Sequence, residues 1–286
     1  MTNPPPLGYT VGTEQEMEYT PMNKRDLLDR CARDGTQRML LARMLDRLEL
    51  CQQREIPTQT PFLSPGEQAA GANLLAACGH PRHLFFGGFE GAERKICLFL
   101  PQWQESEDAI GQEDGPLAVL SATFRPESEL THRDLLGSLM GLGITREKIG
   151  DILISPGVAQ VLVLRETLTI LLSQWESAGR WKLSLRETPL SGLHPAVPQT
   201  KVIRDTVATP RLDAVVSSGF SLSRAKAAAL ISAGRVSLNH RQCLKADRTV
   251  IQGDIISCRG LGKCMVKECS GQSRKGRTML LLERYI

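Results

Sequence analysis

The apolar residues between positions 22 and 80 recur mostly every three or four positions, a spacing typical of amphipathic helices. They are Leu27, Leu28, Cys31, Met39, Leu41, Met44, Leu45 and Leu48. A further helix is expected after Ser64, because Ser64 can act as N-cap, Pro65 suits the first helical position and Glu67 stands at N3. It should run to Cys78 and end at Gly79. We predict a helical N-terminal region over residues 22–80, after a disordered leader over residues 1–21.

Short apolar runs and helical patterns alternate over residues 81–187. The expected strands are HLFFGG (83–88), KICLFLP (95–101), LAVLSATF (117–124), QVLVL (160–164) and a closing strand with Trp181, Leu183 and Leu185. One helix should begin at the capping box Thr131–Asp134, with Leu135, Leu136, Leu139 and Met140 on its core face. The second should cover residues 165–178, with Leu168, Leu171, Leu172 and Trp175 on one side.

This order predicts an open α/β sandwich with both helices on one face of the sheet, and the shape of the RNA-recognition motif is one candidate. The aromatic platform of that motif is missing from the sequence, so base stacking on this sheet is not favoured. A proline-containing stretch, ETPLSGLHPAVPQ (187–199), indicates a boundary, and we place a linker over residues 188–200.

The last domain is expected over residues 201–286. Thr209 can cap a helix that has Pro210 at its first position and ends at Gly219. Ser221 or Ser223 can cap the next helix, which stops at Gly234. A strand through Val236 and Leu238, a tight turn at Asn239-His240 and an arm after Gly253-Asp254 should close a small sheet. The predicted fold class is α+β, with a helical N-terminal segment, a middle α/β sandwich shaped like the RNA-recognition motif and a small C-terminal α+β module.

Charge is distributed unevenly along the 286 residues. The chain carries a net +4, but residues 201–286 hold 16 Lys and Arg against 6 Asp and Glu, while residues 1–200 are net negative. A basic surplus confined to one predicted domain favours a polyanionic partner for that domain, although a solvated basic tail gives the same count.

Composition narrows the class of protein. With 41% hydrophobic and 23% charged residues, the chain has the composition of a globular protein. No apolar run reaches the length of a membrane span, and the first residues lack the pattern of a signal peptide. Eight cysteines without a CxxC pair favour reduced thiols. We expect a cytoplasmic protein that does not contact membranes.

The C-terminal sequence contains a recognisable module. Residues 211–257 carry RLD, SRAKA, GRVSLN and GDII in the order and spacing of the RNA-binding module of ribosomal protein S-four, the αL motif, which they resemble. One departure is His240, where that family usually has glycine; Asn and His tolerate the positive φ such a turn needs. Arg224 and Lys226 should lie in the first turn of a helix, where backbone N–H groups and the helix dipole favour phosphate.

The resemblance and this electrostatic argument assign an RNA surface. Its expected residues are Arg211, Ser223, Arg224, Lys226, Arg235, Asn239, His240, Arg241, Lys245 and Lys263. The alternative is that these side chains only keep the surface soluble, which is a stronger alternative for Arg241 and Lys245 than for Arg224 and Lys226.

Further motifs resemble the YlmH family of bacterial proteins. They are PFLSPGEQ (61–68), GGFEGAERK (87–95) and HRDLLGSLMGLGITREKIGDI (132–152), so the resemblance covers residues 25–286. It implies a factor of bacterial ribosome quality control that would bind a stalled large subunit holding peptidyl-tRNA. We expect a monomer that binds ribosomal RNA of that subunit. A link to cell division genes also belongs to that family. Secondary RNA contacts are considered for Arg94, Lys95, His132 and Arg133, although turn geometry and helix capping explain those positions as well.

Catalytic and metal sites are not expected. Asp213 follows Pro210-Arg211-Leu212 as in the catalytic motif of pseudouridine synthases, but it lies inside the small module rather than in a large catalytic domain. Cys78, His80 and His83 lack a fourth ligand at useful spacing. Neither GxSxG nor a phosphate-binding GxxxxGK[ST] loop occurs. We predict no enzyme, no cofactor and no metal. The alternatives are an RNA-modifying enzyme that uses the module for RNA delivery, and an RNA-binding regulator not tied to ribosomes.

Overall fold

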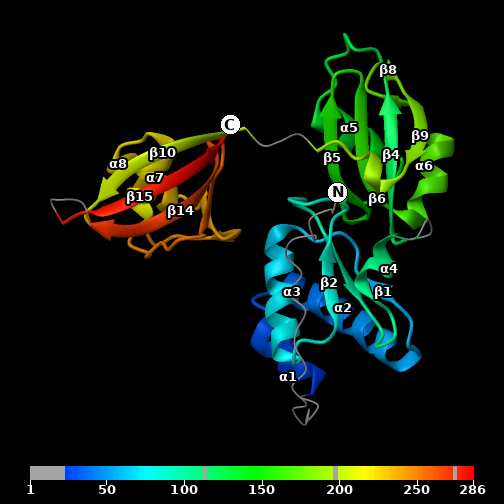
Figure 1. The fold of residues 1–286 in the computed structure, drawn as a ribbon, viewed down its shortest axis with the longest axis horizontal. Coiled ribbons are helices and arrows are strands. Elements are labelled where there is room, and N and C mark those ends of the chain that lie inside the picture. Colours follow the sequence, from blue (N-terminus) through cyan, green and yellow to red (C-terminus); the bar gives the residue numbers. More distant parts are fainter. Residues whose placement is uncertain (1–22, 112–114, 196–198, 273–275) are drawn as a thin grey trace, which may run out of the picture. The chain divides into compact units, whose positions relative to one another are not determined.

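The computed structural model describes residues 23–111, 115–195, 199–272 and 276–286. The chain divides into two compact units between Pro195 and Ala196, and each unit is described by itself (Figure 1). The leader expected over residues 1–21 lies outside the described residues, and so does part of the predicted linker. In the described part of the chain, no helix has both the length and the apolar character that crossing a membrane requires.

The first unit begins with three helices and a small sheet. The helices are α1 (Lys24–Cys31), α2 (Gly35–Arg54) and α3 (Pro65–Ala77). The strands are β1 (Thr58–Gln59), β2 (His83–Phe86) and β3 (Ile96–Phe99), antiparallel in the order β1-β3-β2. The predicted capping box of α3 is confirmed, since the Ser64 and Glu67 side chains each accept the other residue's backbone N–H. Met39, expected in the core, is 60% exposed.

A second sheet follows along the chain. Its elements are β4 (Leu117–Thr123), α5 (His132–Gly141), β5 (Ile149–Ser155), β6 (Val158–Leu164), α6 (Leu168–Gln174) and β9 (Ser184–Thr188). The strands are antiparallel in the order β5-β6-β4-β9, which gives a βαββαβ arrangement. Both helices pack on one face of the sheet. The short helix α4 (Ser106–Gly111) precedes β4, and a hairpin of β7 (Ser177–Ala178) and β8 (Trp181–Lys182) precedes β9.

The predicted strands therefore lie in two sheets rather than one. The runs at 83–88 and 95–101 form β2 and β3, which pair with β1 and not with the four-stranded sheet. Cys97 and Phe99 of β3 pack among the apolar side chains of α1, α2 and α3. Two core positions were also wrong: Met140 and Leu172 are exposed. Each belongs to a helix whose inner face is supplied by other residues, such as Leu139 and Leu171.

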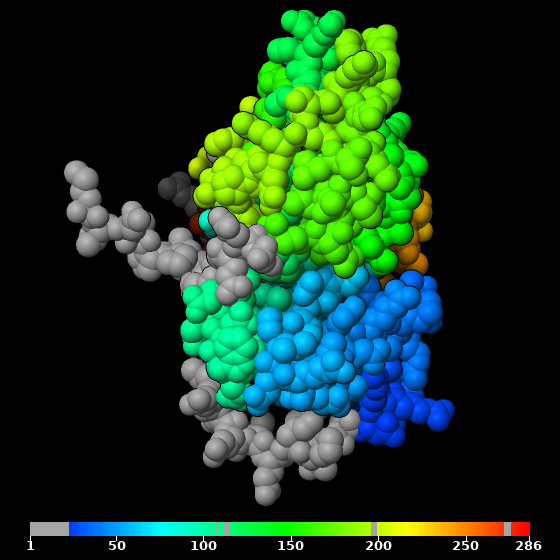
Figure 2. Space-filling view, turned by 90° about the vertical axis from the view of Figure 1, so that its right-hand side faces the viewer, coloured from blue at the N-terminus to red at the C-terminus, as the bar shows by residue number. Residues whose placement is uncertain are grey.

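The face of the four-stranded sheet opposite its helices is covered as well. Leu117, Val119 and Leu162 from this face pack against Phe62 and Ile96 of the N-terminal part. Figure 2 shows these two parts of the first unit, blue to teal and green, in direct contact. The face on which an RNA-recognition motif stacks bases is thus occupied by protein over these residues.

The second unit is a six-stranded antiparallel sheet with two helices on one face (Figure 1). Its elements are β10 (Thr200–Val207), α7 (Leu212–Phe220), α8 (Arg224–Ser232), β11 (Val236–Leu238), β12 (Arg241–Gln242), β13 (Ile255–Cys258), β14 (Gly262–Gln272) and β15 (Thr278–Tyr285). The strand order is β10-β15-β14-β13-β11-β12, so β10 and β12 form the two opposite edges. The α+β class and the small C-terminal module are confirmed.

The ends of α7 differ from the prediction. Thr209 and Pro210 precede the helix, which begins at Leu212 with Arg211 as an extended N-cap. An antiparallel bridge from Arg211 to Thr249 holds this stretch extended. The helix also passes Gly219 and ends at Phe220, where Ser221 adopts the left-handed conformation (φ 55°). Gly219 lies close to β14 inside the helix, where a Cβ would approach the Cys264 Sγ to 3.0 Å.

Candidate nucleic-acid interface

The start of α8 presents two cations beside free N–H groups. Ser223 is the N-cap, as predicted, and its hydroxyl accepts the backbone N–H of Lys226 at 3.2 Å. Arg224 and Lys226 lie in the first turn, and both are exposed. The positive end of the helix dipole and the ammonium group of Lys226 therefore favour an anion at the same place.

Asp213 on α7 fixes two of the predicted RNA-binding arginines. Its carboxylate accepts an N–H from Arg224 at 2.7 Å and two from Arg211 at 3.3 Å. The Asp213 side chain is 9% exposed, whereas that of Arg224 is 56% exposed. Burial raises the pKa of Asp213, but the hydrogen bonds and charges of Arg224 and Arg211 outweigh it, so the net pKa lies below its ordinary value. Arg224 is thus exposed to solvent and at the same time part of the domain's structure, through its bond to Asp213.

A loop adds further cations next to this cluster. The backbone N–H groups of Leu212 and Asp213 donate to the carbonyls of Arg248 and Ala246, at 2.8 and 3.0 Å. These bonds hold the loop that contains Lys245 and Arg248 against the start of α7, and both of those side chains are exposed. Lys245 was predicted from the sequence to contact RNA and Arg248 was not, although a second cation three positions away was a usable signal. We name Arg211, Arg224, Lys226, Lys245 and Arg248 the basic cluster.

The β11–β12 turn has the predicted geometry. Asn239 and His240 both have positive φ, 49° and 62°. The Asn239 amide donates to Asp254 at 2.7 Å and accepts the N–H of Ile255 at 2.8 Å, so this side chain fastens the turn to β13. Arg241, immediately after the turn, is exposed. Asn239 therefore has a structural role in the turn, whereas Arg241 is an exposed cation that is available to a ligand.

Two other predicted residues lie apart from the basic cluster. Arg235 donates to the carbonyl of Arg259 at 3.0 Å, which places a second, unpredicted arginine beside it. Lys263 lies over the ring of Tyr285 at 4.6 Å. Its neighbour Cys264 packs under the helices, and side chains alternate along a strand, so Lys263 belongs to the opposite face of the sheet.

The secondary residues of the first unit have different environments. Arg94 is half-buried and donates to the carbonyls of Phe62 and Ile149 at 2.9 and 3.0 Å. Burial lowers the pKa of Arg94, although nearby carboxylates oppose this effect. Its guanidinium therefore joins segments of the protein, a structural role that the sequence did not indicate. Lys95 is half-buried, while His132 and Arg133 are exposed at the first turn of α5.

Across the described ranges, no three His, Cys, Asp or Glu side chains converge in a way that could hold a metal ion. Burial raises the pKa of the thiols of Cys97 and Cys264, the latter to about 12, so both thiols are protonated at neutral pH.

Two models of known protein families match this chain, one in each unit. The model described as "Putative RNA-binding domain in YlmH" matches residues 123–192, and the S4 domain model matches residues 210–256. The latter range contains the whole basic cluster. The chain is 31% identical over 251 residues to "Ribosome-associated protein quality control protein P2" of Bacillus subtilis (strain 168), an alignment that covers 87% of this chain and 95% of that protein.

A solved structure is also similar. It is described as "Cell division protein ylmH from Streptococcus pneumoniae", and it is 24% identical, with a TM-score of 0.43, over 63% of this chain and 98% of that one. The family is shown by the relative from Bacillus subtilis, which is matched over almost its whole length. The chain belongs to the YlmH family.

Proposed function

We propose that this protein is a non-catalytic RNA-binding factor that binds ribosomal RNA of the large subunit in ribosome-associated quality control. The observation that carries the proposal is the basic cluster, five exposed cations gathered at the starts of α7 and α8 within the S4 domain. The relative from Bacillus subtilis is described as a ribosome-associated quality control protein, which supports the choice of the ribosome as the partner.

Electrostatics favours RNA as the ligand of this surface. Residues 201–286 include 16 basic and 6 acidic residues. Basic side chains that contact RNA phosphates release the counterions condensed on the RNA, and this release favours binding. Arg224 is held by Asp213 and can still offer its remaining N–H groups, which makes it pre-oriented for a phosphate. Lys226, Lys245 and Arg248 add charge around it, so the surface recognises an RNA backbone of defined shape rather than single bases.

The environment of Asp213 supports a binding role over catalysis. A catalytic carboxylate must reach the substrate, whereas both oxygens of Asp213 accept N–H groups from Arg211 and Arg224 and the side chain is mostly buried. This argues against the alternative of a pseudouridine-synthase-like enzyme that uses this residue. We propose further that the protein works in the cytoplasm as a monomer.

Co-sedimentation with purified large ribosomal subunits tests the proposal. Lys226→Ala should weaken binding roughly tenfold, because it removes one phosphate contact worth about 1.4 kcal/mol. Lys201→Ala is the matched control: Lys201 is also exposed, but it lies on β10, at the opposite edge of the sheet from β12. Equal binding by wild type and Lys226→Ala, or an equal loss in Lys201→Ala, would contradict the assignment of this surface.

The finer proposal is that peptidyl-tRNA on the stalled subunit is a second ligand, with His132 and Arg133 as candidate contacts. The protein should then bind subunits that hold peptidyl-tRNA more tightly than empty subunits. A His132→Ala/Arg133→Ala double variant should lose this preference and keep its affinity for empty subunits. The same affinity for both kinds of subunit would limit the function to ribosomal RNA.

A further inference from the structure

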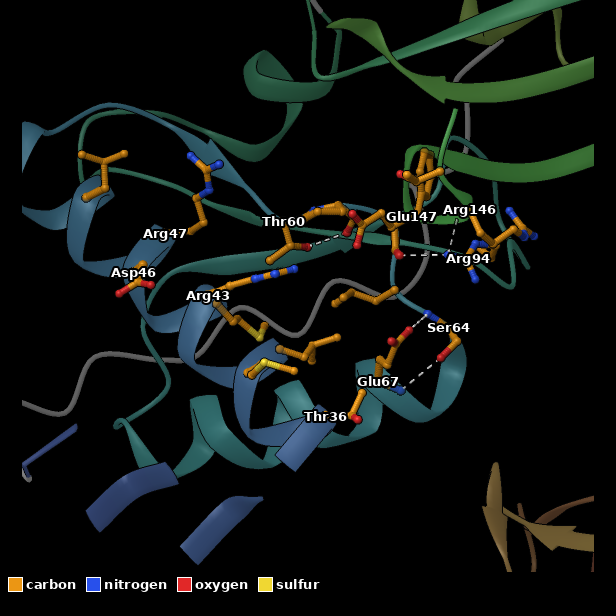
Figure 3. A pocket seen from close by; sticks show the side chains of 18 residues that line it. Thr36, Arg43, Asp46, Arg47, Thr60, Ser64, Glu67, Arg94, Arg146 and Glu147 are labelled. Carbon is orange, nitrogen blue, oxygen red and sulfur yellow. Dashed lines mark hydrogen bonds between the residues drawn. The ribbon is translucent and has the colours of Figure 1, made fainter. Parts of the chain in front are cut away.

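A deep groove crosses the first unit, far along the sequence from the S4 domain. It has a volume of about 1100 Å³ and lies between α2, residues 60–64 and residues 145–147 (Figure 3). The RNA-binding proposal makes no use of it.

The floor and one wall of the groove are apolar. Met44, Phe62 and Leu63 are buried beneath it, and Leu40 is half-buried on its wall. Met39 also lines it and is 60% exposed, so the apolar lining extends from the buried floor to the surface. A partner that covers Met39 and Leu40 would gain affinity from the apolar area removed from water.

The groove is lined by charges of both signs. Of its carboxylates, Asp46 forms an ion pair with Lys24 and Glu147 is exposed. Arg94 and Arg146 donate to backbone carbonyls, and Glu67 caps α3, so these groups are engaged within the fold. Arg43 and Arg47 lie one turn apart on α2 and are exposed. Among the described residues, neither of these two side chains has a hydrogen bond or an ion pair. Figure 3 shows both on the wall formed by α2.

We propose that this groove binds an acidic, apolar peptide segment of a partner protein. Carboxylates of the peptide would pair with Arg43 and Arg47, and its apolar side chains would cover Met39 and Leu40. Peptide helices that dock in grooves use this combination, with apolar anchors at helical spacing and charges at the rim. A small molecule fits less well, because the volume exceeds the range of about 300–1,000 Å³ that is usual for such sites.

Selection from a random library of 12-residue peptides tests the proposal with the full-length protein as bait. Enriched peptides should contain two or more Asp or Glu together with Leu, Ile, Phe or Met three or four positions apart. The strongest peptide, resynthesised, should bind an Arg43→Glu/Arg47→Glu variant about ten- to a hundredfold more weakly, because two attractions become repulsions. Met39→Ser should also weaken it, without loss of folding since the side chain is exposed.

An Arg125→Glu/Lys182→Glu variant is the control, because it makes the same change in net charge at exposed positions outside the groove. It should bind the peptide like wild type. Equal losses in both double variants would mean that only net charge matters, and no enrichment or enrichment of basic peptides would overturn the proposal. A synthetic peptide of residues 1–22, which contains Glu14, Glu16 and Glu18, is tested in parallel. Its binding at least as tightly as the selected peptide would assign the groove to this chain instead of a partner.

Discussion

Replacing Arg224 by Ala should affect both the stability of the S4 domain and its affinity for RNA. The change removes the 2.7 Å hydrogen bond to Asp213, whose side chain is only 9% exposed. Breaking a fully buried ion pair costs about 3–5 kcal/mol, and an exposed one contributes about 0–1 kcal/mol. Arg224 is half-exposed, and Arg211 still contacts Asp213 at 3.3 Å, so we expect a loss of about 1–2 kcal/mol.

Hydrogen exchange in the full-length protein measures this loss locally. A destabilisation of about 1–2 kcal/mol makes the protected amides of α7 and α8 exchange roughly 5- to 30-fold faster, while the amides of the first unit should be unchanged. Arg224→Lys should restore part of the protection, because an ammonium can still reach one carboxylate oxygen. Arg241→Ala, at an exposed arginine with no partner among the described residues, is the control. Unchanged exchange in Arg224→Ala would refute the structural role of the pair.

The pair also predicts a pH dependence. Because the pKa of Asp213 is lowered in the folded state, its contribution is fully present above the unfolded value near 3.8 and is lost as pH falls through the lower folded value. The difference in stability between wild type and Arg224→Ala should therefore be constant at neutral pH and shrink only below about pH 4. A difference that already changes between pH 6 and pH 8 would point to another titrating group.

Two further substitutions test parts of the fold. Arg94→Ala should destabilise the first unit by roughly 1–3 kcal/mol in urea unfolding, because the carbonyl of Phe62 loses its donor while that of Ile149 keeps the one from Arg146. An unchanged midpoint would show that water replaces the guanidinium group. His240→Gly should stabilise the second unit by up to about 1 kcal/mol, since glycine adopts the φ of 62° without strain. A lower melting temperature in that variant would mean that contacts of the imidazole outweigh the strain.

Local signals in the sequence predicted local structure well. The capping serines and threonine at positions 64, 131 and 223 all cap helices, and the Asn239-His240 turn has the positive φ that its composition required. Each of these features depends on side chains and N–H groups within a few residues of each other, so the sequence contains the whole interaction.

Features that depend on distant partners were not predictable in this way. Short apolar runs do not reveal which strands they pair with, so β2 and β3 were assigned to the wrong sheet. The sequence predicted that α7 begins at Pro210, two residues too early. The true start depends on bonds to residues 246–249, which a local pattern does not reveal. A pattern of charges likewise cannot show that Arg94 faces carbonyls or that Arg224 faces a buried carboxylate. Arg94 is thereby a structural cation, whereas Arg224, which is 56% exposed, is both held by the fold and available to RNA.

If cations of the S4 domain bind RNA phosphates, the affinity of the protein for large ribosomal subunits must fall steeply as the salt concentration rises. If about four to six phosphates are neutralised, the slope of log affinity against log salt should be about −3 to −5 for the full-length protein. Lys226→Ala should reduce the size of that slope by about one, and Lys201→Ala should leave it unchanged. A slope near zero with retained binding would mean that phosphate contacts do not drive the association. The same slope in Lys226→Ala as in wild type would mean that Lys226 does not bind a phosphate.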